Sequence, residues 1–269
     1  MPASLATTAL AQQQPSPAPA PAAPAPGPPP GVPTILPRPA PSAPALTVVL
    51  DPAHGGSDTG ARAASVVESE IVLDFARAIR PALESQGIRV LVTRDGNQAP
   101  TFDDRSSLVN GLRDAIFISL HIASTGPVGT VRAYSYPAIA TPPAVSPTGR
   151  LLAQSRSDAA RPALVPWDRA QESHLVASRR LAELLQIQLA QKFRGSPDVP
   201  QTAAVRQLRT IAAPAVAIEV SSVAVSDATQ LRQMARPLAD AVARAVVDFR
   251  PAAGPAPASG GAPGPGGER

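Results

Sequence analysis

The sequence predicts an α/β fold, a single domain in which a mostly parallel, twisted sheet is flanked by helices on both faces. Short apolar runs alternate along the middle of the chain with longer segments that carry apolar residues at helical spacing. Alternation of this kind is typical of parallel strands joined by crossover helices. The uneven distribution of proline then indicates how much of the chain takes part.

Proline is concentrated at the two ends of the chain. Of 34 prolines, 15 lie in residues 1–45 and five in residues 251–269, which leaves 14 for the residues between. The first segment is rich in Pro, Ala and Ser, a composition typical of extended polyproline II chain, and the last is rich in Gly and Pro. We therefore predict a signal remnant and disordered linker over 1–45, one folded domain over 46–250 and a disordered tail over 251–269.

The first elements are expected in the order strand, helix, strand. The run LTVVL at 46–50 is typical of a buried strand. A helix is predicted over 70–84, and Gly87 ends it. Its apolar face repeats every four residues, at Ile71, Phe75, Ile79 and Leu83. The run RVLVT at 89–93 predicts the next strand.

The middle of the domain continues this pattern and then departs from it. A short helix is predicted over 102–112, a buried strand over 115–120 (AIFISL) and an alternating strand, nearer an edge, over 130–136. The five prolines within 139–166 indicate a long irregular insertion.

Three elements complete the domain. A Leu-rich helix is predicted within 167–192 and a buried strand over 215–220 (AVAIEV). A last helix is expected over 227–249, with Asp227 as its N-cap.

Composition excludes several classes of function. The formal charge is only +4, and the Arg residues form no run of the kind that follows a phosphate backbone, so we expect no nucleic acid partner. The chain has no Cys, which excludes disulfides and Cys-based zinc or redox sites. It has no apolar stretch of the length that spans a membrane. Residues 9–11 (ALA) have the small-x-small pattern of a signal cleavage site. A flexible N-terminus that carries no signal is an equally good interpretation of the same residues.

Polar residues lie where the predicted strands end, which is where ligands bind in sheets of this kind. His54 follows the first strand, His121 follows the third, Glu68 lies near the start of the first helix, and Glu219 lies inside the strand 215–220. Two imidazoles and one carboxylate, with a fourth position left to water, are the ligand set of a catalytic zinc site. A second carboxylate that is not a ligand can move a proton from water to a leaving group.

Each of these residues also has a purely structural interpretation. His54 beside glycines is equally well a turn residue, and Glu68 at a helix start favours the helix dipole. His121 after an apolar strand needs partners for its nitrogens, and Glu219 is costly to bury without a cation or hydrogen-bond network. His174, the third histidine, is expected at the surface or the rim of a site.

Five segments together resemble, in order, the motifs of the zinc-dependent N-acetylmuramoyl-L-alanine amidases (amidase_3 type). These cell-wall amidases cut the bond between the lactyl group of muramic acid and the first alanine of the stem peptide. The first segment, VVLDPAHGGSDTGA, resembles the family's VVIDPGHGGxDPGA. The others are ESEIVL at 68–73, Val92-Thr93-Arg94 with Arg105 and Asn110, FISLH at 117–121 and PAVAIEV at 214–220.

The resemblance implies roles for four residues. His54, Glu68 and His121 would bind one Zn²⁺ per domain, and Glu219 would be the catalytic base. Zinc would polarise the scissile carbonyl and lower the pKa of its bound water, while Glu219 accepts the proton and passes it to the departing nitrogen.

Other matched positions are expected to support the site. Arg94, Arg105 and Asn110 would brace loops or the helix rather than touch substrate. Asp51 or Asp58 would orient a ligating imidazole, because such imidazoles usually pair with a carboxylate.

The implied function is hydrolysis of the muramoyl–alanine amide in peptidoglycan, for cell-wall remodelling or daughter-cell separation. We expect a monomer in the periplasm or cell envelope, with residues 1–45 as a spacer and the insertion lining or gating the substrate groove. Whether an activator protein is needed stays open.

Three departures from the family pattern leave room for alternatives: Ala53 replaces a glycine, and residues 122–124 and 220–222 differ from the usual runs. The alternatives are a non-catalytic peptidoglycan-binding module that retains a zinc site, and a zinc peptidase with other substrates.

Overall fold

The structure is a computed structural model that describes residues 46–138, 166–225 and 227–249. The predicted linker at 1–45, the predicted tail at 251–269 and nearly all of the insertion, 139–165, lie outside the described residues. Their assignments therefore stay predictions.

A six-stranded sheet forms the centre of the described domain, with strand order β4-β1-β5-β8-β6-β7. All neighbouring strands run parallel except β6, which is antiparallel to β8. The prediction of a mostly parallel sheet is thus confirmed. The strands are β1 (Thr47–Pro52), β4 (Arg89–Val92), β5 (Ala115–Ile122), β6 (Val131–Ser135), β7 (Gln201–Thr202) and β8 (Ala215–Val220).

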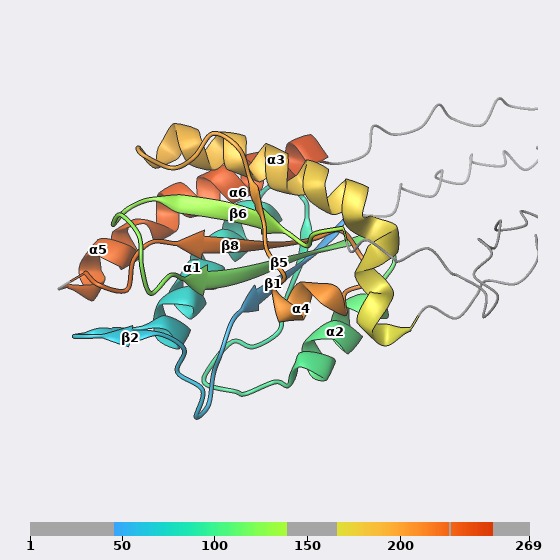
Figure 1. Cartoon of the computed structure of the whole chain (residues 1–269), viewed down its shortest axis with the longest axis horizontal. Coiled ribbons are helices and arrows are strands. Elements are labelled where there is room, and N and C mark those ends of the chain that lie inside the picture. The colour runs from blue at the N-terminus through green and yellow to red at the C-terminus, as the bar shows by residue number, and fades with distance from the viewer. Residues whose placement is uncertain (1–45, 139–165, 226, 250–269) are drawn as a thin grey trace, which may run out of the picture. The chain divides into compact units, whose positions relative to one another are not determined.

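Helices cover both faces of this sheet, as Figure 1 shows for α3 and α6 on one side and α2 and α4 on the other. A small hairpin, β2 (Arg62–Ala63) with β3 (Val66–Val67), precedes the first helix. The helices are α1 (Glu68–Glu84), α2 (Phe102–Asn110), the 3₁₀ helix η1 (Trp167–His174), α3 (Leu175–Lys192), α4 (Arg206–Arg209), α5 (Ala228–Gln233) and α6 (Ala235–Phe249).

Two apolar cores lie on the two faces, because successive side chains of a strand point to opposite sides. The larger core packs Val48, Ile118 and Ile218 of the sheet against α1, α3 and α6. The smaller core packs Phe117 and Ala217 of the sheet against α2 and α4. At its carboxyl edge the smaller-core face carries polar residues of β1, β5 and β8, which form part of the candidate site.

Three elements differ from those expected, and the first two carry candidate site residues. β5 runs on to Ile122, so His121 lies inside the strand instead of after it. α1 begins two residues early, at Glu68 itself. The expected single last helix is interrupted at Met234, because Pro237 has no backbone N–H and its ring is accommodated only in the first turn of a new helix.

Candidate metal and catalytic site

Strand register brings the polar residues of three strands to one edge of the sheet. Asp51 of β1 pairs with Ser119 of β5, and His121 of β5 pairs with Glu219 of β8. Because Ser119 and His121 are two residues apart, their side chains share a face. The sheet therefore presents four polar residues beside one another at the carboxyl ends of parallel strands, and two of them, His121 and Glu219, were predicted there.

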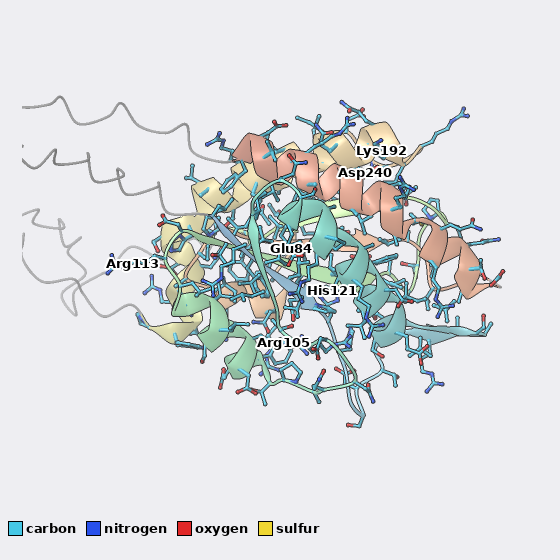
Figure 2. All side chains as sticks on the ribbon, turned by 180° about the vertical axis from the view of Figure 1, so that it is seen from behind. Glu84, Arg105, Arg113, His121, Lys192 and Asp240 are labelled. Carbon is cyan, nitrogen blue, oxygen red and sulfur yellow. The ribbon has the colours of Figure 1, made fainter. Side chains whose placement is uncertain are left out.

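The loop after β1 carries His54 in a left-handed conformation, with φ of 64°. Two buried arginines hold this loop through its carbonyl groups. Arg105 of α2 (Figure 2) donates to the carbonyls of His54 at 2.9 Å and Pro52 at 3.2 Å. Arg94 donates to the carbonyls of Pro52 and Ala53, both at 2.8 Å. The predicted bracing role of both arginines is confirmed.

Asn110 braces a second loop, the one that leads into β8. Its amide donates to the carbonyl of Thr210 at 2.9 Å and its side-chain oxygen accepts from the backbone N–H of Ala212 at 2.7 Å. This loop fixes the start of the strand that carries Glu219.

Three side chains converge in front of these loops. Nε2 of His54 and Nδ1 of His121 each lie 3.2 Å from Oε1 of Glu68, and one ligand atom from each of the three residues lies within 4.8 Å of the others. Tetrahedral zinc with bonds of about 2.0–2.1 Å separates its ligand atoms by about 3.3–3.4 Å. The two nitrogen–oxygen distances are close to this spacing, so this donor set of two nitrogens and one carboxylate oxygen fits a zinc ion.

The carboxylate of Glu68 is buried and is kept ionised by its surroundings. Burial raises the pKa of Glu68, but hydrogen bonds from His121 and His54 and from the backbone N–H groups of Ala61 and Ile122 outweigh burial and hold that pKa well below its usual range. The amides of Ala61 and Ile122 lie 2.8 and 3.0 Å from the two carboxylate oxygens. An ionised, oriented carboxylate is what a metal ligand requires.

Two carboxylates favour positive charge at His54. The hydrogen bond to Glu68 raises the pKa of His54 to about 9, against the opposing effect of burial, and Asp58 adds to the increase. Nδ1 of His54 lies 2.9 Å from Oδ2 of Asp58. Of the two carboxylates expected to orient an imidazole, Asp58 therefore does so directly.

Glu219 lies beside the converging side chains and outside the group of three. It is partly exposed on β8, next to His121 in register and opposite Arg132 of β6. Tyr134 of β6 has a raised pKa, first because of burial and then because Glu219 is near. The carboxylate of Glu219 thus lies, partly exposed, on the same sheet face as His121.

His174 takes no part in this cluster. It ends η1 and precedes α3, and burial lowers its pKa. Its position is partly buried, and the expectation of a surface or rim residue stays a prediction.

The chain resembles known proteins over the same region that holds the site. The family model described as N-acetylmuramoyl-L-alanine amidase (Amidase_3) matches residues 48–248. A curated relative, the sporulation-specific N-acetylmuramoyl-L-alanine amidase of Bacillus subtilis, is 34% identical over 99 residues, which cover 36% of this chain and 38% of the relative. The amidase CwlM of Bacillus licheniformis is 35% identical over 99 residues, 36% of this chain and 39% of that protein. The matched part thus spans less than two fifths of these relatives.

Solved structures share the fold. The amidase AmiC2 of Nostoc punctiforme superposes with a TM-score of 0.56 at 20% identity, covering 76% of this chain and 96% of that one. The CwlD amidase of Clostridioides difficile, solved in complex with the GerS lipoprotein, gives 0.56 at 17% identity over 76% and 98% of the two chains. Within the described residues, no helix has the length and apolar character needed to cross a membrane. The family match spans most of the chain, and the chain therefore belongs to the N-acetylmuramoyl-L-alanine amidase family, Amidase_3.

Proposed function

We propose that this protein is a zinc-dependent hydrolase of the amide bond between the lactyl group of N-acetylmuramic acid and L-alanine in peptidoglycan. The observation that carries the proposal is the convergence of His54, Glu68 and His121, with ligand atoms within 4.8 Å, in a chain of this family. Curated relatives named as amidases of the same bond support the choice of substrate.

The four candidate site residues would have two roles, metal binding and proton transfer. His54, Glu68 and His121 would hold one Zn²⁺, which, when bound, supplies a Lewis acid for the scissile carbonyl and for water. Glu219 would accept a proton from the attacking water and return it to the departing alanine nitrogen. The arrangement needs one chain only, because all four residues come from the same domain.

The substrate implies where the protein acts. Peptidoglycan lies outside the cytoplasmic membrane, so we propose an exported protein of the periplasm or cell envelope that serves cell-wall remodelling or daughter-cell separation. Residues 1–45 would then be a spacer, since about 30 residues of polyproline chain at roughly 3 Å each span on the order of 90 Å.

A peptidoglycan-binding module that retains zinc is the second candidate. Residues 122–124 and 220–222, which directly follow His121 and Glu219, depart from the family's usual runs. Both strands still carry the ligand and the candidate base side by side in register, which supports turnover.

Digestion of purified sacculi separates the two candidates. The wild-type protein with one equivalent of zinc is expected to release stem peptides with a free alanine amino group. Glu219→Gln is expected to reduce release by about 100-fold or more while leaving zinc bound, and a chelator is expected to stop it. Asp240→Asn, an exposed change on α6, is the matched control and should behave as wild type. Zinc-loaded wild type that binds sacculi without releasing peptides would favour the binding module.

A further inference from the structure

Two buried polar residues lie behind the candidate metal site and have no part in the proposed reaction. Asp51 of β1 is 2% exposed and Ser119 of β5 is 0% exposed, and the two residues are partners in the strand register. Burying a carboxylate and a hydroxyl is costly unless each is hydrogen-bonded. Their partners therefore indicate what these residues do.

The single proton of the Ser119 hydroxyl fixes the direction of a chain of hydrogen bonds. Oγ of Ser119 donates to Oδ2 of Asp51 at 2.8 Å. Nε2 of His121 lies 3.2 Å from the same Oγ. Because a hydroxyl has one proton, Oγ can only accept from His121, so Nε2 must carry a hydrogen. In a metal-bound His121, which must be neutral, the lone pair then lies on Nδ1, the nitrogen that faces Glu68.

Asp51 is itself held from the other side. Its Oδ1 accepts from Oγ1 of Thr93 at 2.6 Å and forms a buried ion pair with Arg105. The same guanidinium donates to the carbonyl of His54 at 2.9 Å. One buried network therefore reaches the side chain of His121 and the backbone of His54.

The two imidazoles are consequently oriented through opposite nitrogens. Asp58 accepts from Nδ1 of His54, which leaves Nε2 to face Glu68. Ser119 accepts from Nε2 of His121, which leaves Nδ1 to face the same carboxylate. Outer partners of this kind fix the tautomer and the ring orientation of a ligating histidine.

We propose that Ser119 and Asp51 are positioning residues that hold His121 in the Nε2–H tautomer, so that it binds metal through Nδ1 while His54 binds through Nε2. The inference rests on the metal site of the proposed function and is independent of the amide chemistry. Loss of such a partner typically lowers metal affinity about 10- to 100-fold.

Zinc affinity of Ser119→Ala, measured by competition with a chromophoric chelator, is the first test. We expect dissociation constants 10 to 100 times higher than for wild type. Ser106→Ala is the matched control, since Ser106 is also 0% exposed and its hydroxyl is also hydrogen-bonded, to Thr210 and to Gln207 at helix α4. Its zinc affinity should equal that of wild type. Equal affinity in Ser119→Ala and wild type would overturn the inference.

The second test is the tautomer itself, read from the two-bond ¹⁵N–¹H correlations of the zinc-loaded protein. In wild type, His121 should show a metal-bound Nδ1 and a protonated Nε2, and His54 the reverse. This measurement needs no variant, so it stands even if Ser119→Ala does not fold. A His121 bound through Nε2 contradicts the inference. Zinc-loaded protein with these tautomers that leaves sacculi intact would instead contradict the proposed function alone.

Discussion

The charge of His54, a candidate metal ligand, makes the stability of the metal-free fold depend on pH. Its pKa is raised to about 9 by Glu68 and Asp58, from an ordinary value of 6.5. A raised pKa means that the folded state binds the proton more tightly than the unfolded state. In the metal-free protein this stabilisation is fully present below pH 6.5 and is lost as the pH rises through 9.

Thermal midpoints measured in chelator between pH 6 and pH 10 test this dependence. We expect the midpoint to fall across pH 6.5 to 9 in wild type, and the fall to be smaller in His54→Gln. Added zinc should remove the dependence near neutral pH, because a ligating imidazole is neutral. An equal fall in His54→Gln would show that another group is responsible.

Arg94 is a buried cation that donates hydrogen bonds to backbone carbonyl groups. It is 4% exposed and donates to the carbonyls of Pro52, Ala53, Ser69 and Gly96. Lysine has no planar fork to reach several carbonyls at once. Arg94→Lys is therefore expected to lower the free energy of unfolding by about 3 kcal/mol, measured by urea denaturation.

The exposed Arg77→Lys is the matched control for Arg94→Lys. The Arg77 side chain is 59% exposed, so its replacement should change the free energy of unfolding by less than about 0.5 kcal/mol. Similar effects of the two changes would mean that Arg94 does not hold the loop.

Some of the residues of the candidate site could be predicted from the sequence and others could not. His121 and Glu219 could be named because each is an unusual residue type for its surroundings, whereas His54 and Glu68 were singled out through the family motifs. Ser119 could not, because a serine in an apolar strand carries no signal of its own; only its two-residue offset from His121 indicates that it shares the face. Ala53 stands where the family has a glycine, yet the left-handed backbone conformation falls on the next residue, His54.

The loop between β1 and α1 shows how an element positions the site, because at Gly60 it packs directly against two candidate ligands. A Cβ added at Gly60 would lie 2.6 Å from both Oε2 of Glu68 and Cδ2 of His54. Its φ of 65° also disfavours any side chain. Gly60→Ala is therefore expected to displace two candidate ligands and weaken zinc binding by at least about tenfold.

Gly87 provides the control that separates backbone strain from crowding. It has nearly the same φ, 68°, yet a Cβ there would meet nothing within 4 Å. Gly87→Ala should lower the free energy of unfolding by about 1 kcal/mol and leave zinc affinity unchanged. If both alanine variants bind zinc as wild type does, the loop is not packed around the ligands as described.

Most elements followed from periodicity, and the exceptions have physical causes. The strand at Ala215–Val220 was predicted with its observed bounds, because a buried parallel strand is an uninterrupted apolar run. The hairpin β2–β3 was missed because two strands of two residues are too short for any alternation to appear. The antiparallel direction of β6 was also missed, although the eight residues between β5 and β6, 123–130, are fewer than a parallel crossover needs.

At the scale of the whole molecule, the prediction of a domain over 46–250 depends on the last helix. α6 closes the larger core: Leu238, Ala241, Val242, Ala245 and Val246 are all 0% exposed. Burying side chains of this size contributes several kcal/mol, a large share of the about 5–15 kcal/mol that stabilises a typical domain. The domain should therefore tolerate removal of residues 1–45 and 251–269 but not of α6.

Three lengths of chain test this boundary by thermal unfolding and zinc binding. Residues 46–250 should unfold cooperatively within about 2 °C of the full chain, since a typical loss of 1 kcal/mol would shift the midpoint by about 2–4 °C, and should bind zinc equally well. Residues 46–234, which lack α6, should show no cooperative transition. The site residues are all present in the shorter piece. If that piece binds zinc as tightly as the full chain, the strand ends that carry the candidate ligands keep their arrangement without the larger core. A 46–250 piece that fails to fold would instead show that the flanking segments contribute to the domain, against their composition.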